Sequence, residues 1–232
     1  MEIKTKLANK GNYGSARSIN DIKYIVIHYT GNDGDTDENN GIYFNREVVQ
    51  VSAHYFVDSD SITQSVPDDY IAWHCGTKQA YKHKECRNAN SIGIEICDDI
   101  KNGVIYPSAK TIENTLELTK SLMKKYNIPK ENVIRHYDVT GKLCPAYWSG
   151  TTANYNKWKS EFWDKLTITS VKPNPQTGGD TTFKIKVSKE CFAYNKSTTV
   201  PKGVYTIVET NGNMGKLKSG VGWVNLADVT KI

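Results

Sequence analysis

Three side chains that could bind a metal are far apart in the sequence. His28 lies in the apolar run VIHYT, and His136 and Cys144 lie in the stretch RHYDVTGKLCP, where Gly141 allows the chain to fold back. Two imidazoles and one thiolate suit zinc, and three protein ligands leave the fourth tetrahedral position to water, as in catalytic zinc sites. The spacing alone also fits a Cys–His nucleophile pair or an ordinary loop.

A carboxylate in the stretch SIGIEIC, residues 91–97, could move the protons of a hydrolysis reaction. The stretch alternates, with three isoleucines on one side and Gly93, Glu95 and Cys97 on the other. Burying a carboxylate on a strand is costly unless it has a partner or a use. Glu95 is therefore the candidate general base, and a structural salt bridge is the alternative.

A second group of possible metal ligands lies in HCGTKQAYKHKEC, residues 74–86. Cys75, His83 and Cys86 have a spacing that could hold a structural zinc. The segment is polar and lysine-rich, which is equally typical of a solvated loop. We keep both interpretations open at this point.

These residues must be positioned by a mixed set of strands and helices. The pattern predicts strands at 23–29, 52–58, 62–66, 71–74, 91–97 and 133–137, and helices at 37–47, 108–126 and 156–166. Ser108 can cap the long helix, and Asn127 ends it before a proline. The sequence thus predicts an α/β domain, a central sheet flanked by helices, over residues 1–166.

A second, smaller domain is predicted after a proline- and glycine-rich linker at 167–181. Residues 182–232 contain only short strand patterns and glycine-rich turns, which favours a small all-β barrel. From Thr181 onward there are eight lysines and three acids, whereas the preceding residues carry equal numbers of basic and acidic side chains. The net charge of +5 is therefore concentrated in the tail, which predicts an anionic partner or simply a lysine-coated surface.

Composition excludes several classes of protein. No apolar run approaches the ~20 residues needed to cross a bilayer, so we expect no membrane insertion. The five scattered cysteines do not suggest a disulfide framework. The N-terminal segment lacks the apolar core of a secretion signal.

Five motifs in this order resemble the zinc-dependent N-acetylmuramoyl-L-alanine amidases, a family that includes phage endolysins and is related to peptidoglycan recognition proteins. The motifs are VIHYT, VSAHYFVD, IAWHCG, SIGIEIC and RHYDVTGKLCP. The resemblance spans about residues 20–165 and implies Zn²⁺ held by His28, His136 and Cys144. It also implies hydrolysis of the amide between N-acetylmuramic acid and the first L-alanine of the peptidoglycan stem peptide.

The same resemblance assigns further roles. Glu95 stands where the family has its general base, and Lys142 stands where a lysine steadies the developing oxyanion. Trp73 and His74 match a Trp–His pair that lines the substrate groove. The tail resembles bacterial SH3-like wall-binding modules, most clearly in GKLKSGVGWVNL at 215–226.

The resemblance implies peptidoglycan as the partner, with anionic wall polymers as possible ligands of residues 182–232, and no nucleic acid. We expect a phage endolysin made in the host cytoplasm without a signal peptide, which reaches the cell wall after release through a membrane pore, with a host-encoded autolysin as the alternative setting. Two alternatives stay open: a non-catalytic peptidoglycan-recognition protein, and a cysteine-type wall hydrolase that uses Cys144 and His136.

Overall fold

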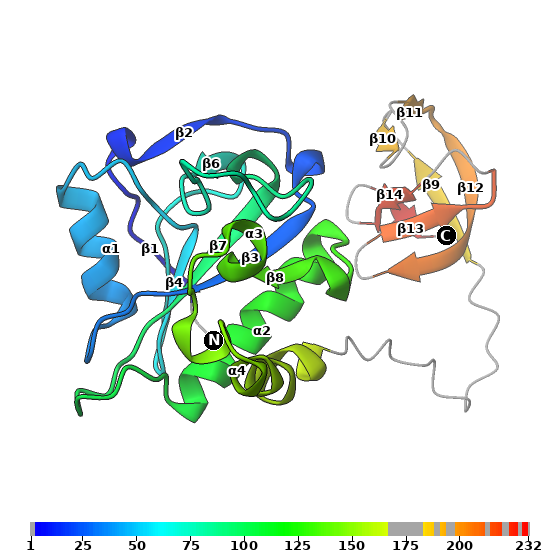
Figure 1. Ribbon diagram of the computed structural model, residues 1–232. Helices are drawn as coiled ribbons and strands as arrows, with labels where there is room; N and C mark the ends of the chain where they lie inside the picture. The colour runs from blue at the N-terminus through cyan, green and yellow to red at the C-terminus, as the bar shows by residue number, and fades with distance from the viewer. Residues whose placement is uncertain are drawn as a thin grey trace. The chain divides into compact units, whose positions relative to one another are not determined.

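The computed structural model describes residues 3–166, 183–187, 191–193, 198–211, 214–219, 223–226 and 229–231. The chain divides into two compact units, Met1–Ile168 and Thr169–Ile232 (Figure 1). The predicted linker, 167–181, lies outside the described residues. No helix in the described part is both long enough and apolar enough to span a bilayer.

The first unit is built on a mixed six-stranded sheet in the order β1-β5-β4-β7-β3-β8. All neighbouring pairs are parallel except β4 and β5. β2 and β6 form a separate two-stranded sheet. The strands are β1 (Ile3–Thr5), β2 (Tyr13–Ala16), β3 (Tyr24–Tyr29), β4 (Tyr55–Val57), β5 (Ile62–Gln64), β6 (Tyr70–Ala72), β7 (Ser91–Ile96) and β8 (Val133–Arg135).

Four α-helices accompany this sheet. They are α1 (Asp37–Arg46), α2 (Ala109–Tyr126), α3 (His136–Thr140) and α4 (Thr152–Lys157). The last continues as a π-helical turn at Trp158–Phe162 and a 3₁₀ turn at Trp163–Leu166. Shorter 3₁₀ turns lie at Lys10–Asn12, Ile19–Asp21, Asn88–Asn90, Lys130–Asn132 and Ala146–Trp148.

The two faces of the sheet are covered differently, as the alternation of its central strands requires. The isoleucines of β7 pack into one large core with α2 and with the turns that follow α4. On the opposite face, Val26 of β3 packs with Val139 of α3 and with Cys75 and Cys86 of the loop between β6 and β7. Polar residues of β3 and β7 on this second face are therefore free to form a site.

The long helix α2 begins and ends as its sequence predicts. The Ser108 side chain accepts a hydrogen bond from the backbone N–H of Thr111, which satisfies an otherwise unpaired donor of the first turn. Asn127 adopts a left-handed conformation with φ 52° and closes the helix. Leu116, Leu122 and other apolar residues of α2 are buried against the sheet.

Some sequence expectations were wrong at their boundaries. The strand predicted at 133–137 ends at Arg135, and His136 begins α3 instead. Asp138 causes this change, because its carboxylate accepts the Arg135 backbone N–H and caps the new helix. The strands β1 and β2 were not predicted, and the last helical segment begins at Thr152 rather than at 156.

The described part of the second unit consists of β-strands, in line with the all-β prediction. Five strands form an antiparallel sheet in the order β14-β13-β12-β9-β15, and β10 pairs with β11. Its core contains Ile185, Val187, Ile207 and Leu217. The strands are β9 (Phe183–Val187), β10 (Cys191–Ala193), β11 (Thr198–Val200), β12 (Gly203–Asn211), β13 (Met214–Leu217), β14 (Trp223–Asn225) and β15 (Thr230–Lys231).

Candidate metal centre

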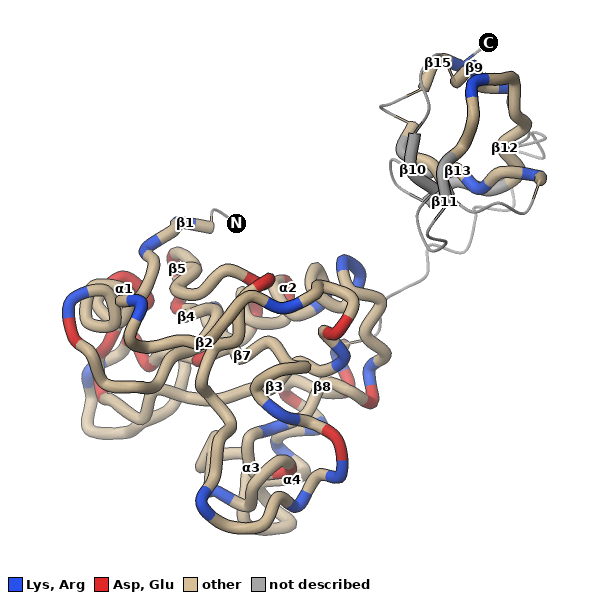
Figure 2. The backbone as a smooth tube through the Cα atoms, turned by 90° about the horizontal axis from the view of Figure 1, so that it is seen from above, with Lys and Arg blue, Asp and Glu red and all other residues tan. Residues whose placement is uncertain are grey.

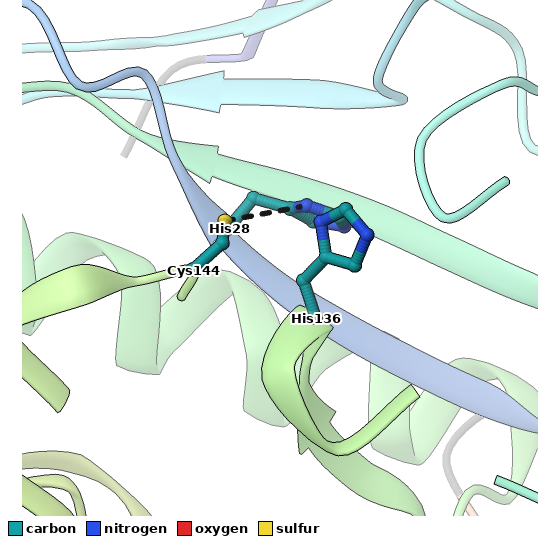
Figure 3. A group of neighbouring side chains, drawn as sticks. All are labelled: His28, His136 and Cys144. Carbon is teal, nitrogen blue, oxygen red and sulfur yellow. Dashed lines mark hydrogen bonds between the residues drawn. The ribbon is translucent and has the colours of Figure 1, made fainter. Parts of the chain in front are cut away.

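The three predicted metal ligands meet on the second face of the sheet. His28 lies near the end of β3, His136 begins α3, and Cys144 lies in the loop after it (Figure 3). One ligand atom of each lies within 4.8 Å of those of the others, and all three residues are buried. The Cys144 Sγ is 3.8 Å from His28 Nδ1, and the two imidazole centroids are 4.6 Å apart.

The loop that carries Cys144 folds back onto α3 in the expected way. Gly141 ends α3 with φ 87°, a left-handed conformation that favours glycine. The backbone N–H of Tyr137 then donates to the carbonyl of Cys144 at 3.0 Å. This bond holds Cys144 next to the helix that begins with His136.

Glu95 stands beside His28 because of the register of the two central strands. His28 of β3 pairs with Glu95 of β7 across the parallel ladder, so the two side chains share a face. The Glu95 Oε1 is 3.9 Å from His28 Nδ1. Burial raises the pKa of Glu95 to about 8, while the Lys142 charge acts in the opposite direction. A carboxyl that titrates near neutrality is suited to accept and return a proton.

His74 is buried and holds His28 by a hydrogen bond between His74 Nδ1 and His28 Nε2, 3.0 Å long. On its other side, His74 Nε2 lies 3.1 Å from Ser91 Oγ. The single hydroxyl proton of Ser91 goes to the carbonyl of Arg87, 2.7 Å away. Ser91 Oγ must therefore accept a hydrogen bond from His74 Nε2–H, which leaves His74 Nδ1 to accept the hydrogen bond of His28 Nε2–H.

This hydrogen-bond chain fixes the tautomer of His28. With its proton on Nε2, His28 presents the lone pair of Nδ1 toward Cys144 and Glu95. Metal-binding histidines commonly donate their other N–H to a fixed partner in this way. His74 was expected in the substrate groove; it lines the cavity and also makes this bond.

The remaining ionisable groups of the centre are held without charge. Burial is the largest cause that lowers the pKa of His28 well below its ordinary value, and burial lowers the pKa of His136 to about 4. Burial raises the pKa of Cys144 to about 12, so the free thiol is a poor nucleophile. Neutral imidazoles are the form that binds metal, and a bound cation would stabilise the thiolate.

The arrangement fits a metal ion. Two buried atoms in this region, His136 Nδ1 and Glu95 Oε2, have no hydrogen-bond partner within the described residues. Unpaired buried polar atoms are rare and call for an explanation such as an ion or a water. His136 Nδ1 converges with the His28 and Cys144 atoms in a donor set of the kind that zinc prefers, and the Glu95 carboxylate lies beside it.

A cavity of about 310 Å³ opens over the centre. Trp73, His74, Glu95 and Lys142 line it along with the three candidate ligands. It adjoins a second cavity of about 550 Å³ that also borders Glu95 and Lys142 and extends along α1 past Asn39, Asn40 and Tyr43. All the predicted site residues therefore lie along one groove.

Two other clusters of possible metal ligands, one with cysteine and histidine and one of aspartates, do not form comparable centres. His83 Nδ1 accepts the backbone N–H groups of Glu85 and Cys86, and Cys75 Sγ donates to Asn88 Oδ1. Within residues 3–166, the set Cys75, His83 and Cys86 does not converge as metal ligands. Asp37 and Asp58 lie close together, but serine, threonine and backbone donors already occupy their oxygens.

Sequence reasoning did not identify Ser91 or Asp35 as parts of this neighbourhood. Ser91 lies on the same side of β7 as Gly93 and Glu95, so the alternation of the strand carried the signal. Asp35 raises the pKa of Glu95 by its charge and lies in the loop before α1, where no pattern pointed to it. Asp138 caps α3 and pairs with Arg135.

Comparison with known proteins places this centre in a defined context. Residues 18–147 match the profile of the N-acetylmuramoyl-L-alanine amidase family. The amidase CwlL of Bacillus licheniformis is 32% identical over 190 residues, which cover 78% of this chain and 49% of CwlL. BlyA of Bacillus subtilis is 28% identical over 234 residues, covering 91% of this chain and 60% of BlyA. The chain thus spans about half the length of these curated relatives.

Solved structures show the same fold. PlyL is 31% identical, with a TM-score of 0.58 over 72% of this chain and 97% of PlyL. The catalytic domain of XlyA is 28% identical, with a TM-score of 0.58 over 72% of this chain and 99% of that domain. The mixed α/β fold of the first unit is therefore the fold of these catalytic domains.

Proposed function

The chain belongs to the N-acetylmuramoyl-L-alanine amidase family, and on this premise we propose that it hydrolyses the amide between N-acetylmuramic acid and L-alanine in bacterial peptidoglycan. The observation that carries the proposal is the convergence of His28, His136 and Cys144 beside Glu95 on the floor of a groove. We further propose that these three residues hold zinc. When bound, zinc would polarise the scissile carbonyl and make a water more acidic.

Side chains of the groove carry out proton transfer, charge stabilisation and substrate binding. The Glu95 carboxylate accepts the proton of the attacking water and delivers it to the nitrogen of the departing L-alanine. The ammonium group of Lys142, at the rim of the same cavity, faces the charge that develops on the carbonyl oxygen. His74 keeps His28 in the tautomer that binds metal, and Trp73 provides an aromatic wall for the sugar or peptide.

The cysteine-hydrolase alternative is disfavoured by the chemistry of Cys144. A nucleophilic cysteine needs a lowered pKa, whereas burial raises that of Cys144 to about 12. The Cys144 Sγ contacts His28 Nδ1 and the backbone of Tyr29, and within the described residues it makes no hydrogen bond with His136. The presence of both Cys144 and Glu95 likewise favours an enzyme over a protein that only binds peptidoglycan.

Mass spectrometry of digested peptidoglycan tests the proposal. We expect released stem peptides that begin with a free L-alanine amine, beside intact glycan strands. EDTA should abolish this release, zinc should restore it, and iodoacetamide added to the zinc-loaded protein should leave it unchanged. Release that resists EDTA but is blocked by iodoacetamide would establish the cysteine mechanism, and binding without release would establish a recognition protein.

For residues 182–232 we propose an SH3-like module that binds anionic polymers of the wall. The described strands form an antiparallel sheet with its own core, and Lys184 and Lys186 are exposed on one side of β9. Removal of residues 167–232 should weaken wall sedimentation of the protein and leave its zinc content unchanged. Equal sedimentation of the truncated protein would show that the tail does not target the wall.

The setting we propose is that of a phage endolysin, which acts on the cell wall after release from the host cytoplasm. A matched solved structure is described as an endolysin from Bacillus subtilis, 30% identical with a TM-score of 0.58. Lysis of cells only after their membrane is permeabilised would agree with this setting. Lysis by intracellular expression alone would contradict it.

A further inference from the structure

We propose that a third pocket, next to the metal centre and distinct from the two cavities described above, binds an oxyanion of the wall substrate, either a carboxylate or a phosphate. The pocket has a volume of about 470 Å³, and Lys78, Lys82, Lys142, Thr77 and Thr140 contribute to its walls. It meets the cavity over the metal centre at Lys142. The inference rests on the proposed amidase function, because it concerns the substrate of the same groove.

The chemistry of the pocket is that of an anion site. Three ammonium groups, the Thr77 hydroxyl and the Gln79 amide supply hydrogen-bond donors, whereas the Thr140 hydroxyl donates to the His136 carbonyl, and no acidic residue lines the walls. Figure 2 shows Lys and Arg segments gathered on the backbone around α3. Clustered ammonium groups repel each other, and an anion between them relieves that repulsion.

The lysines of this pocket are free of internal ion pairs. In the described part of the chain, the salt bridges of lysines involve Lys110, Lys125 and Lys159. Neither Lys78, Lys82 nor Lys142 lies within salt-bridge distance of a carboxylate there. Lys142 does exert its charge on Glu95, which places the pocket within electrostatic reach of the proposed base. The positive charges are thus available to a ligand.

One of the three lysines is held in place by its surroundings. The backbone N–H groups of Lys82 and His83 donate to the carbonyl of Val139 in α3, at 3.0 and 3.2 Å. The Lys82 Nζ lies 4.3 Å from the centre of the Tyr137 ring, in a cation–π contact. The Lys82 side chain also crosses Gly141, where an added Cβ would approach Lys82 Cε to 2.8 Å.

This geometry links the pocket to the reaction. The loop that carries Lys82 is fastened to α3, the same helix that begins with His136. An anionic group bound there therefore stands at a fixed place relative to the scissile amide. A stem-peptide carboxylate close to that amide and a phosphate of a wall polymer strand share the required chemistry. The experiment must separate these two sources.

The test compares Lys78→Ala, Lys82→Ala and the double variant with Lys84→Ala, in the full-length zinc-loaded protein. Lys84 is an exposed lysine of the same loop that does not line the pocket, so it matches the loss of charge. Soluble muramoyl peptides with a free carboxylate on the second stem residue are cleaved beside the same peptides with that carboxylate amidated. Intact walls and walls stripped of phosphate polymers are cleaved in parallel.

A carboxylate ligand predicts that KM rises up to about fivefold for each pocket lysine, with kcat and zinc content unchanged. The effect should fall with salt, should vanish for the amidated peptide and should be absent in Lys84→Ala. A phosphate ligand predicts a loss on intact walls alone. Either pattern supports the pocket and names its source, whereas double-variant kinetics equal to those of Lys84→Ala on every substrate would overturn it.

Binding measured without turnover separates this inference from the proposed function. In the Glu95→Gln background, affinity for the carboxylate-bearing muramoyl peptide and for inorganic phosphate is measured by calorimetry. We expect the double pocket variant to weaken whichever of the two ligands binds, and Lys84→Ala to leave it unchanged. If the wild-type protein cleaves no muramoyl amide, the proposed function fails, and this binding experiment still decides the pocket: affinities equal to those of Lys84→Ala for both ligands would overturn it.

Discussion

His28 and His74 are joined by a 3.0 Å hydrogen bond between Nε2 and Nδ1, and this bond sets which nitrogen His28 turns toward Cys144. The bond depends in turn on Ser91 at the start of β7, which accepts the hydrogen bond of the His74 Nε2–H and so leaves His74 Nδ1 as an acceptor. Ser91, Gly93 and Glu95 therefore act as one row along the strand. Ser91 holds His74, Gly93 leaves space for the His74 ring, and Glu95 lies beside His28.

We predict that His74→Ala lowers zinc affinity by about 10- to 100-fold, the range seen when a partner of a metal ligand is lost. Without His74, the tautomer and rotation of the His28 ring are no longer fixed. Competition with a chromogenic chelator measures the dissociation constant. Thermal unfolding of the chelated protein serves as the control that the fold persists, and an unchanged zinc affinity with an intact fold would remove the positioning role.

Gly93→Ala should disturb the hydrogen bond between His28 and His74, because the new methyl group would displace the His74 ring. A Cβ at position 93 would lie 2.5 Å from His74 Cγ and 2.8 Å from its Nδ1, so the ring must shift. We expect the free energy of unfolding to fall by about 1–3 kcal/mol, as is usual for overpacking, together with weaker zinc binding.

A double-mutant cycle checks the cause of this effect. In the His74→Ala background the imidazole is absent, so Gly93→Ala should cost markedly less. Denaturant unfolding of the four proteins without metal supplies the comparison. Equal costs in the two backgrounds would show that Gly93 is required for a reason other than His74.

The sequence predicted the central strands well because their burial leaves a simple pattern. Apolar β-branched runs mark β3, and the alternation of β7 correctly separated the isoleucines from Gly93 and Glu95. The long helix α2 carried both a cap and a stop signal. Residue type made His28, His136 and Cys144 candidates for a zinc site, but their spacing is a weak signal, and the resemblance was needed to choose this set over the alternatives.

The misses have physical reasons. The apolar run before His136 reads as a strand that continues, yet the Asp138 carboxylate, three residues after Arg135, turns the chain into α3. The short strand β1 is exposed along its whole length, so it shows no burial pattern. The lysine pocket has no sequence signal, because Lys82 and Lys142 are 60 residues apart and line one pocket through the anchoring of the Lys82 loop on Val139.

Glu95→Gln should retain zinc and lose activity by about 10²- to 10⁴-fold, the usual contribution of a positioned acid–base group. The amide keeps the shape of the side chain but cannot accept the proton of a water. Zinc content and release of stem peptides are measured on the same preparations. Glu131→Gln, an exposed site in the turn after α2, is the matched control and should be fully active. Near-normal turnover of Glu95→Gln would reassign the base.

We predict that the buried His54 lowers the free energy of unfolding in acid. It is fully buried, its Nδ1 accepts the Gly93 backbone N–H, and burial, followed by the Arg17 charge, lowers its pKa well below the ordinary 6.5. Below pH 6.5 the unfolded chain therefore binds a proton that the folded chain refuses. The free energy of unfolding should fall by about 1.4 kcal/mol per pH unit from this residue, from pH 6.5 down to its folded pKa.

Urea unfolding of the chelated full-length protein between pH 7.5 and 5 measures this slope. His54→Gln removes the titrating group while its amide oxygen can still accept the Gly93 N–H, so its slope should be the same near pH 7.5 and approach a difference of about 1.4 kcal/mol per pH unit below pH 6.5. The contributions of His28 and His136, which have the same sign, and of Glu95, whose raised pKa gives the opposite one, cancel in the comparison. Identical slopes for the two proteins would mean that His54 takes up its proton in the folded state.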